Sequence, residues 1–166
     1  NGTGVSATMY AAKVLKELTT ERTVYFINFS GEEDGLYGSG SFVNTTLLKF
    51  PGTLKLVINL DQLGGTLHQP DNDKIYCERD EIPSPGTNNL ESARVTDTIA
   101  NLTEIYSDLT PVISNAYSSD YIPFETKGYV ITGLFQYSQF PFRHTEHDSF
   151  SRVDTISFME AIKIST

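Results

Sequence analysis

The spacing of apolar residues changes along the chain, and each change marks an expected element. Apolar positions recur at helical intervals over Val5–Leu18 and again over 89–106, which predicts two amphipathic helices. Nearly unbroken apolar runs at 22–29 (RTVYFINF) and 54–60 (LKLVINL) are typical of strands that are covered on both faces of a sheet. A further strand is expected at 129–135 (YVITGLF).

Shorter elements fill the intervals. We expect a helix from Leu36 to about Leu48, and short strands around 74–77 and 111–114. A closing helix should begin after Asp154 or Thr155, which are good N-cap residues. Strands that alternate with helices predict an α/β sheet with helices on both faces.

Composition narrows the possible partners. The 166 residues fit one domain, and their formal net charge is −9. Nucleic acid and anionic membrane surfaces need clustered Lys and Arg, so both are disfavoured as partners. No apolar run reaches the length of a membrane span, about 18 residues. The single cysteine, Cys77, can form no internal disulfide, and we expect it to be structural. His68, in a polar stretch from 68 to 89, is expected to be solvated.

Acidic and histidine residues follow the expected strands. Glu32 and Glu33 come after the first apolar run, Asp61 ends the second, and the hexapeptide 143–148 (RHTEHD) follows the strand at 129–135. If these strands are parallel neighbours, the groups meet at their carboxyl ends, where open α/β sheets bind ligands. Carboxylates and an imidazole from separate loops suit Zn²⁺. Adjacent glutamates would diverge, so that one binds metal while the other acts as general base on water. The alternative is a solvated acidic turn with surface histidines.

Several motifs occur together over Asn1 to about Asp154. They are NGTG, FINFSGEEDGLYGS, INLDQLG, SSDYIPFETKG and HTEHD. In this order and approximate spacing the chain resembles the co-catalytic zinc aminopeptidase family. That family includes secreted bacterial leucine aminopeptidases and, more distantly, glutaminyl cyclases and glutamate carboxypeptidase. The resemblance implies a three-layer α/β/α sandwich with a mixed, mostly parallel sheet.

The resemblance also implies roles for individual residues. Glu32 matches the general base that takes a proton from the water between two zinc ions. Glu33 matches a ligand of one zinc, shared with His144, and Asp61 matches a ligand of the other. His147 is a competing candidate for the histidine ligand, although it lies three residues late for the motif.

Some positions depart from the family pattern. Its remaining ligands, a histidine and a bridging aspartate, are expected upstream of Asn1. We therefore expect residues 1–166 to be the larger C-terminal part of one catalytic domain, N-terminally truncated and inactive alone. Arg143 stands where some relatives have a tyrosine that stabilises the oxyanion, and it either takes that role or is simply exposed. Tyr121 stands where relatives often have histidine.

Further roles are expected near that position and in the last loop. Asp120 and Tyr121 are candidates for residues close to the substrate, and Asp120 is also a candidate N-cap for a helix at 122–127. Asp148 would support the loop that carries the ligand histidine.

The expected function is a zinc-dependent aminopeptidase, a hydrolase that removes N-terminal residues from peptides. Alternatives are a carboxypeptidase or glutaminyl cyclase relative, or a non-catalytic ectodomain or scaffold of the same fold. The resemblance implies secretion. A truncated sheet would expose a strand edge, through which the chain could dimerise.

Overall fold

The computed structural model describes residues 1–50, 52–67, 69–81, 88–136 and 142–166. The α-helices are α1 (Gly2–Leu15), α2 (Tyr37–Ser41), α3 (Asn89–Tyr106), α4 (Ile122–Glu125) and α5 (Thr155–Ile164). The strands are β1 (Val57–Asp61), β2 (Lys74–Arg79), β3 (Thr110–Asn115) and β4 (Ile131–Phe135). Short helical segments of other types are η1 (Phe42–Thr46), η2 (Leu47–Lys49) and η3 (Phe150–Arg152).

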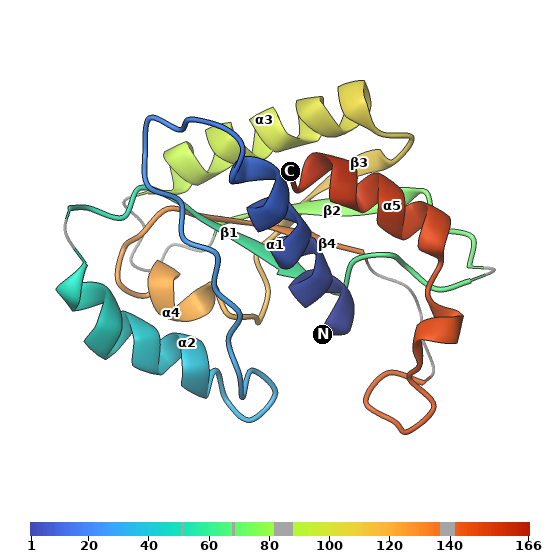
Figure 1. Cartoon of the computed structure of the whole chain (residues 1–166), viewed down its shortest axis with the longest axis horizontal. Coiled ribbons are helices and arrows are strands. Elements are labelled where there is room, and N and C mark those ends of the chain that lie inside the picture. The colour runs from blue at the N-terminus through green and yellow to red at the C-terminus, as the bar shows by residue number, and fades with distance from the viewer. Residues whose placement is uncertain (51, 68, 82–87, 137–141) are drawn as a thin grey trace.

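The strands form one mixed sheet in the order β1-β4-β2-β3. The pairs β1–β4 and β2–β3 are parallel, and β2–β4 is antiparallel. Helices α1, α3 and α5 lie on one side of the sheet, with α2 and α4 on the other (Figure 1). The predicted α/β/α sandwich with a mixed sheet is therefore confirmed.

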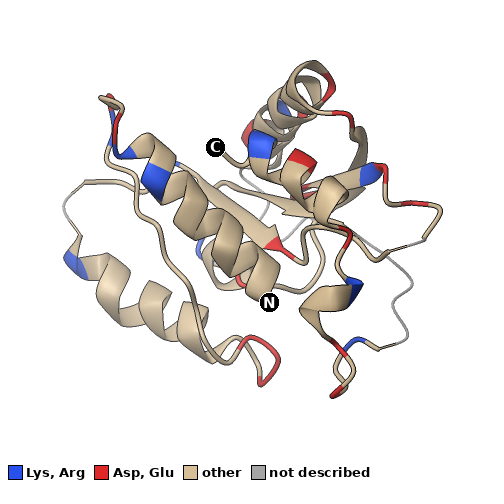
Figure 2. Ribbon diagram, turned by 45° about the vertical axis from the view of Figure 1, so that its right-hand side comes forward, with Lys and Arg blue, Asp and Glu red and all other residues tan. Residues whose placement is uncertain are grey.

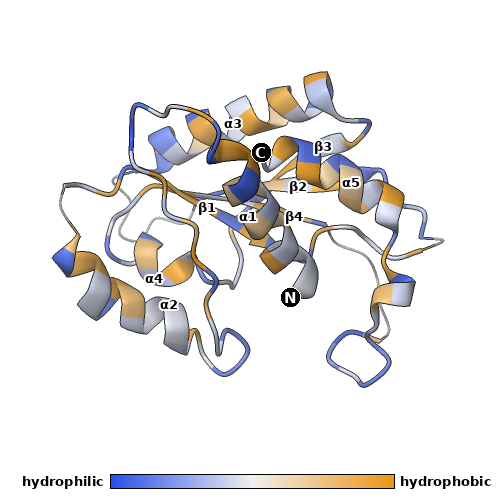
Figure 3. Ribbon diagram, in the orientation of Figure 1, coloured by the Kyte–Doolittle hydropathy of each residue, from blue (hydrophilic) through white to orange (hydrophobic). Residues whose placement is uncertain are grey.

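Each face of the sheet has its own hydrophobic core. Beneath α1, α3 and α5 the core includes Leu63, Ile75, Cys77 and Leu134. On the other face it includes Val43, Phe124 and Ile131, with Tyr121 beside them. The helices and strands carry both hydrophobic and hydrophilic residues, and long stretches of the connecting loops are hydrophilic (Figure 3). Cys77 is buried in the first core, as its predicted structural role requires.

The periodic helices are confirmed, with shifted boundaries at α1. Helix α3 spans the predicted 89–106. Helix α1 begins at Gly2, before the predicted Val5, because the Asn1 side chain caps it by accepting from the Gly4 backbone N–H at 2.8 Å. Asp154 is the N-cap of α5 and accepts from the N–H groups of Ile156 and Ser157.

The predicted strand at 22–29 is wrong. These residues have no strand assignment, although β1, β2, β3 and β4 all form where strands were expected. Val24, Tyr25 and Phe26 are exposed, and Phe29 alone in this run packs against the second core. An apolar run predicts burial, but a strand also needs a neighbour to accept its ladder hydrogen bonds.

The predicted helix over 36–48 is present with mixed geometry. It begins as α2, continues as a π-helical turn in η1 and ends as the 3₁₀ turn η2. Within the described part of the chain, no helix is long and apolar enough to cross a membrane. His68 lies outside the described residues.

Candidate active site

Three loops meet in one cleft at the carboxyl ends of β1 and β4. The cleft has a volume of about 820 Å³. Its lining includes the charged residues Glu32, Glu33, Asp34, Asp61, Asp120, Arg143, His144, Asp148 and Arg152. Acidic segments mark the loop before α2 and the end of β1 (Figure 2). Because β1 and β4 are parallel neighbours, the expected convergence of Asp61 with the 143–148 loop occurs.

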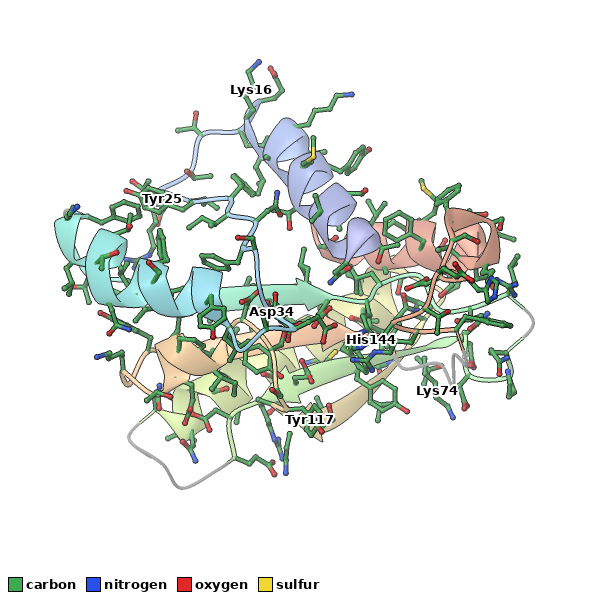
Figure 4. All side chains as sticks on the ribbon, turned by 90° about the horizontal axis from the view of Figure 1, so that it is seen from below. Lys16, Tyr25, Asp34, Lys74, Tyr117 and His144 are labelled. Atoms are coloured by element: carbon green, nitrogen blue, oxygen red, sulfur yellow. The ribbon has the colours of Figure 1, made fainter. Side chains whose placement is uncertain are left out.

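Glu33 and His144 are in direct contact. Glu33 Oε1 lies 2.9 Å from His144 Nε2, and the two residues come from loops more than a hundred positions apart in the sequence. Figure 4, where Asp34 and His144 are labelled, shows these loops approaching each other. Arg143 Nε also donates to His144 Nε2 at 3.1 Å. Nε2 of His144 therefore meets both the carboxylate of Glu33 and the guanidinium of Arg143.

Asp61 is held by a chain of polar side chains. Its Oδ2 accepts from Ser119 Oγ at 2.8 Å, and Ser119 Oγ accepts in turn from Asn59 Nδ2 at 2.9 Å. Its Oδ1 accepts from Asn1 Nδ2 at 2.5 Å. Ser119 is a site residue that sequence reasoning missed. The available signal was its position in the SSDYIPF motif, beside the two residues that were singled out.

Two residues of the site have left-handed backbone conformations without being glycine. They are Gln62, with φ of 49°, and His144, with φ of 61°. Such conformations are held only where surrounding contacts over-determine them, and they cluster at functional sites. With its amide oxygen toward the guanidinium, Gln62 accepts from Nε and Nη2 of Arg143 at 3.0 Å. Arg143 therefore joins the turn after β1 to the loop of His144.

Burial and neighbouring charges raise the pKa of two carboxyl groups in the cleft, Glu32 and Asp120. Burial, followed by the neighbouring carboxylates Glu33, Asp61 and Asp120, raises the pKa of Glu32, while Arg143 lowers it. Burial also raises the pKa of Asp120, as does Asp61, and a hydrogen bond with Ser39 opposes this rise. The cleft therefore favours cationic occupants.

The donor set has the chemistry of a zinc site but is incomplete within the described residues. Carboxylate and imidazole donors are present, as Zn²⁺ requires. Glu33 and His144 already touch, while Asp61 is engaged by Ser119 and Asn1. Among the residues whose positions are described, no group of three or more His, Cys, Asp or Glu residues could hold a metal ion. Of the ligands that a zinc site needs, the described residues therefore bring one pair into contact, Glu33 and His144.

The other sequence candidates occupy different places. Asp120 and Asp148 line the cleft. Tyr121 is 1% exposed and lies beneath the cleft rather than on its wall. The predicted N-cap role of Asp120 is wrong, because the N-cap of α4 is Tyr121 and makes no side-chain capping bond. His147 is turned toward Phe142, with the ring centroids 6.1 Å apart, and it is not part of the cleft wall.

Comparisons with known proteins agree with this fold. The model of peptidase family M28 matches residues 1–165. Aminopeptidase YwaD from Bacillus subtilis (strain 168) is 36% identical over 64 residues, which are 39% of this chain and 14% of that protein.

Solved structures match over almost the whole chain. BSAP, a zinc aminopeptidase from Bacillus subtilis, is 25% identical with a TM-score of 0.74, and the match covers 99% of this chain and 40% of that one. LapB from Legionella pneumophila is 23% identical with a TM-score of 0.83, and the match covers 99% of this chain and 44% of that one. The chain therefore spans less than half the length of these structures.

Proposed function

Because the chain belongs to peptidase family M28, we propose that it is the larger C-terminal part of a zinc aminopeptidase domain. The observation that carries this proposal is the contact between Glu33 and His144 in an acidic cleft that also contains Glu32 and Asp61. The similarity to BSAP, itself described as a zinc aminopeptidase, supports zinc as the metal.

The residues of the cleft divide into binding and proton-handling groups. Glu33 and His144 would hold one zinc ion, and Asp61 would contribute to a second. Bound zinc supplies a Lewis acid that polarises a carbonyl and lowers the pKa of water. Glu32 would accept a proton and return it to the leaving amine, since its carboxylate lies beside Glu33 without being paired to His144. Arg143, which lines the cleft, would stabilise a developing oxyanion.

The charge of the cleft supports action at a free amino terminus. Six acidic residues line it, against Arg143 and Arg152. Four of the six are not assigned to metal in this proposal. A carboxylate such as Asp120 could therefore hold the ammonium group of a peptide substrate, which favours an exopeptidase over an endopeptidase.

The full ligand set would come from more than these 166 residues. The pair of ligands at Glu33 and His144, and the match to only 40% of BSAP, both support this proposal. We expect the chain alone to have little activity. Secretion stays a prediction from resemblance, and self-association through the edge of the sheet also stays a prediction.

The test compares this chain with a version extended upstream, each incubated with zinc and then desalted. We expect about two zinc ions in the extended protein, together with hydrolysis of a leucyl-anilide. Glu33→Ala should remove both properties, whereas Glu32→Ala should remove hydrolysis and keep the metal. Glu104→Ala, an exposed change on α3, is the matched control and should alter neither.

The outcomes separate the alternatives. Absence of metal from the extended protein would contradict the proposal and favour a non-catalytic scaffold. Metal binding with turnover of an N-terminal glutamine peptide, but not of the anilide, would identify a glutaminyl cyclase relative. Turnover only of peptides with a free carboxyl terminus would identify a carboxypeptidase.

A further inference from the structure

A buried carboxyl group lies under the cleft without belonging to its wall. Glu78, on β2, is 6% exposed. In the sheet it is paired with Gly133 of β4, which is in turn paired with Asn59 of β1. Paired residues on neighbouring strands share a face, so Glu78 and Asn59 both point toward the layer of α2 and α4. Among the described residues, Glu78 takes part in no ion pair.

Gly133 leaves room for this carboxyl group to meet Tyr121. A Cβ atom at Gly133 would lie 2.6 Å from Glu78 Oε2 and 3.0 Å from Tyr121 Cε1. The tyrosine ring and the carboxylate therefore occupy the space where any other residue would place its side chain.

The phenol group of Tyr121 connects the 117–121 loop to this carboxyl group. Its hydroxyl accepts from the backbone N–H of Tyr117 at 2.7 Å, and its ring lies beside the Glu78 carboxylate at Gly133, where the two side chains interact. Both Tyr121 and Glu78 are buried. Burial raises the pKa of Glu78 to about 7, and the hydrogen bond with Tyr121 opposes this rise.

The 117–121 loop, held by these contacts, places Ser119 at the site. Ser119 lies between the two ends of the Tyr117–Tyr121 bond and is 5% exposed. Its hydroxyl donates to Asp61 at 2.8 Å. A displacement of the loop would therefore change the orientation of the Asp61 carboxylate.

We propose that Glu78 is a positioning residue, which acts through Tyr121 to hold the 117–121 loop and thereby orients Ser119 on Asp61. The carboxyl group, the phenol and the Tyr117 amide form one continuous path from β2 to the cleft. The effect of this path on metal binding rests on the proposed function of Asp61. The effect of Glu78 on the position of the 117–121 loop does not depend on that proposal.

Hydrogen exchange at the Tyr117 amide tests the hold on the loop directly. Tyr121→Phe removes the acceptor of this amide, and Glu78→Met removes the carboxyl group while keeping the length of the side chain. Each should speed exchange by about tenfold or more. The double variant should exchange no faster than Tyr121→Phe alone, because both changes break the same path. Glu78→Gln keeps an acceptor oxygen and should stay near the wild-type rate.

A buried substitution on the other face of the sheet is the control. Thr103→Val removes a buried hydroxyl group that donates to the Ile99 carbonyl at 2.9 Å. It should lower stability while leaving exchange at Tyr117 unchanged, so that a general loss of stability is distinguished from loss of the path.

Cobalt binding then tests the effect on the site. In a chain that binds Co²⁺, Tyr121→Phe and Glu78→Met should weaken affinity by about tenfold, and Thr103→Val should not. Unchanged exchange at Tyr117 in Glu78→Met, or additive effects in the double variant, would overturn the proposal. If wild-type protein and its upstream-extended form bind no cobalt, the proposed function fails, and the exchange result still decides whether Glu78 holds the loop.

Discussion

At the scale of single residues, Gly133 on β4 lies against two buried side chains, Glu78 and Tyr121. Gly133→Ala would bring a methyl group within 2.6 Å of Glu78 Oε2, and both Glu78 and Tyr121 are fixed by burial. We expect a loss of about 1–3 kcal/mol in the free energy of unfolding, measured by urea denaturation. In the matched variant Gly40→Ala, the new Cβ meets nothing within 4 Å inside a helix, and stability should rise by about 0.5–1 kcal/mol. Equal effects of the two variants would contradict this packing argument.

Glu78 also predicts how stability depends on pH. Burial raises its pKa in the folded state from 4.5 to about 7. Between these values the folded carboxyl group keeps a proton that the unfolded chain has released. Its contribution to stability is therefore complete below pH 4.5 and is lost as the pH rises through 7. The loss should be on the order of 3 kcal/mol.

Replacing the carboxyl group checks this prediction. The difference in unfolding free energy between Glu78→Gln and wild type should change across this pH range and level off above it. Glu104→Gln, an exposed change on α3, is the matched control. A pH-independent difference for Glu78→Gln would show that the carboxyl group titrates normally.

Residues of the site were predictable where a motif that resembles a known family carries them, even when they meet across the chain. Glu33 and His144 were expected together for this reason, and they are in contact. Ser119 lies in another of these motifs, but its role depends on Asn59 and Asp61, each about sixty positions away, so the motif indicates a nearby site without showing these partners. Tyr121 was expected near the substrate, but its ring lies under the cleft. There it occupies the space above Gly133, beside Glu78.

At the scale of elements, helix α5 depends on a single capping residue. Asp154 Oδ1 accepts from the N–H groups of Ile156 and Ser157, both at 3.1 Å, and its Oδ2 accepts from Asn72 at 2.9 Å. Asp154→Ala should lower the free energy of unfolding by about 1–2 kcal/mol. Thr155→Ala, an exposed change at the next position, is the control and should cost less than half as much in the same thermal or urea measurement. A small effect of Asp154→Ala would show that the remaining contacts fix α5.

Some elements were predicted more accurately than others, because a helix depends on residues within one segment and a strand depends also on its partner. The period of α3 is set by residues that all lie on one helix, and its predicted boundaries are those observed. The run at 22–29 has the composition of a strand, but Tyr25 instead stacks on Phe50, with ring centroids 4.5 Å apart, and Phe29 packs on Phe42. The composition of a segment indicates whether its side chains are buried, whereas strand pairing also requires a partner strand elsewhere in the chain.

At the scale of the whole molecule, β1 is an edge strand of the sheet. Within the described residues it has a strand partner only in β4; the Leu60 carbonyl accepts from Asn1 Nδ2 at 3.4 Å, and the outer edge near Ile58 has no strand partner. Ile58 on this strand is 52% exposed. Long apolar edges pair with other chains, and natural proteins discourage this with lysine. We therefore expect self-association through β1.

Light scattering coupled to size-exclusion chromatography tests this expectation over a wide concentration range. The average mass should rise with concentration in wild-type protein, and Ile58→Lys should reduce that rise. Leu48→Lys is the matched control, because Leu48 is 74% exposed on η2, away from the strand edge, and its replacement should leave the association unchanged. A single monomeric mass at every concentration would contradict edge pairing. An equal reduction by both lysines would show that net charge, rather than the edge of β1, controls association.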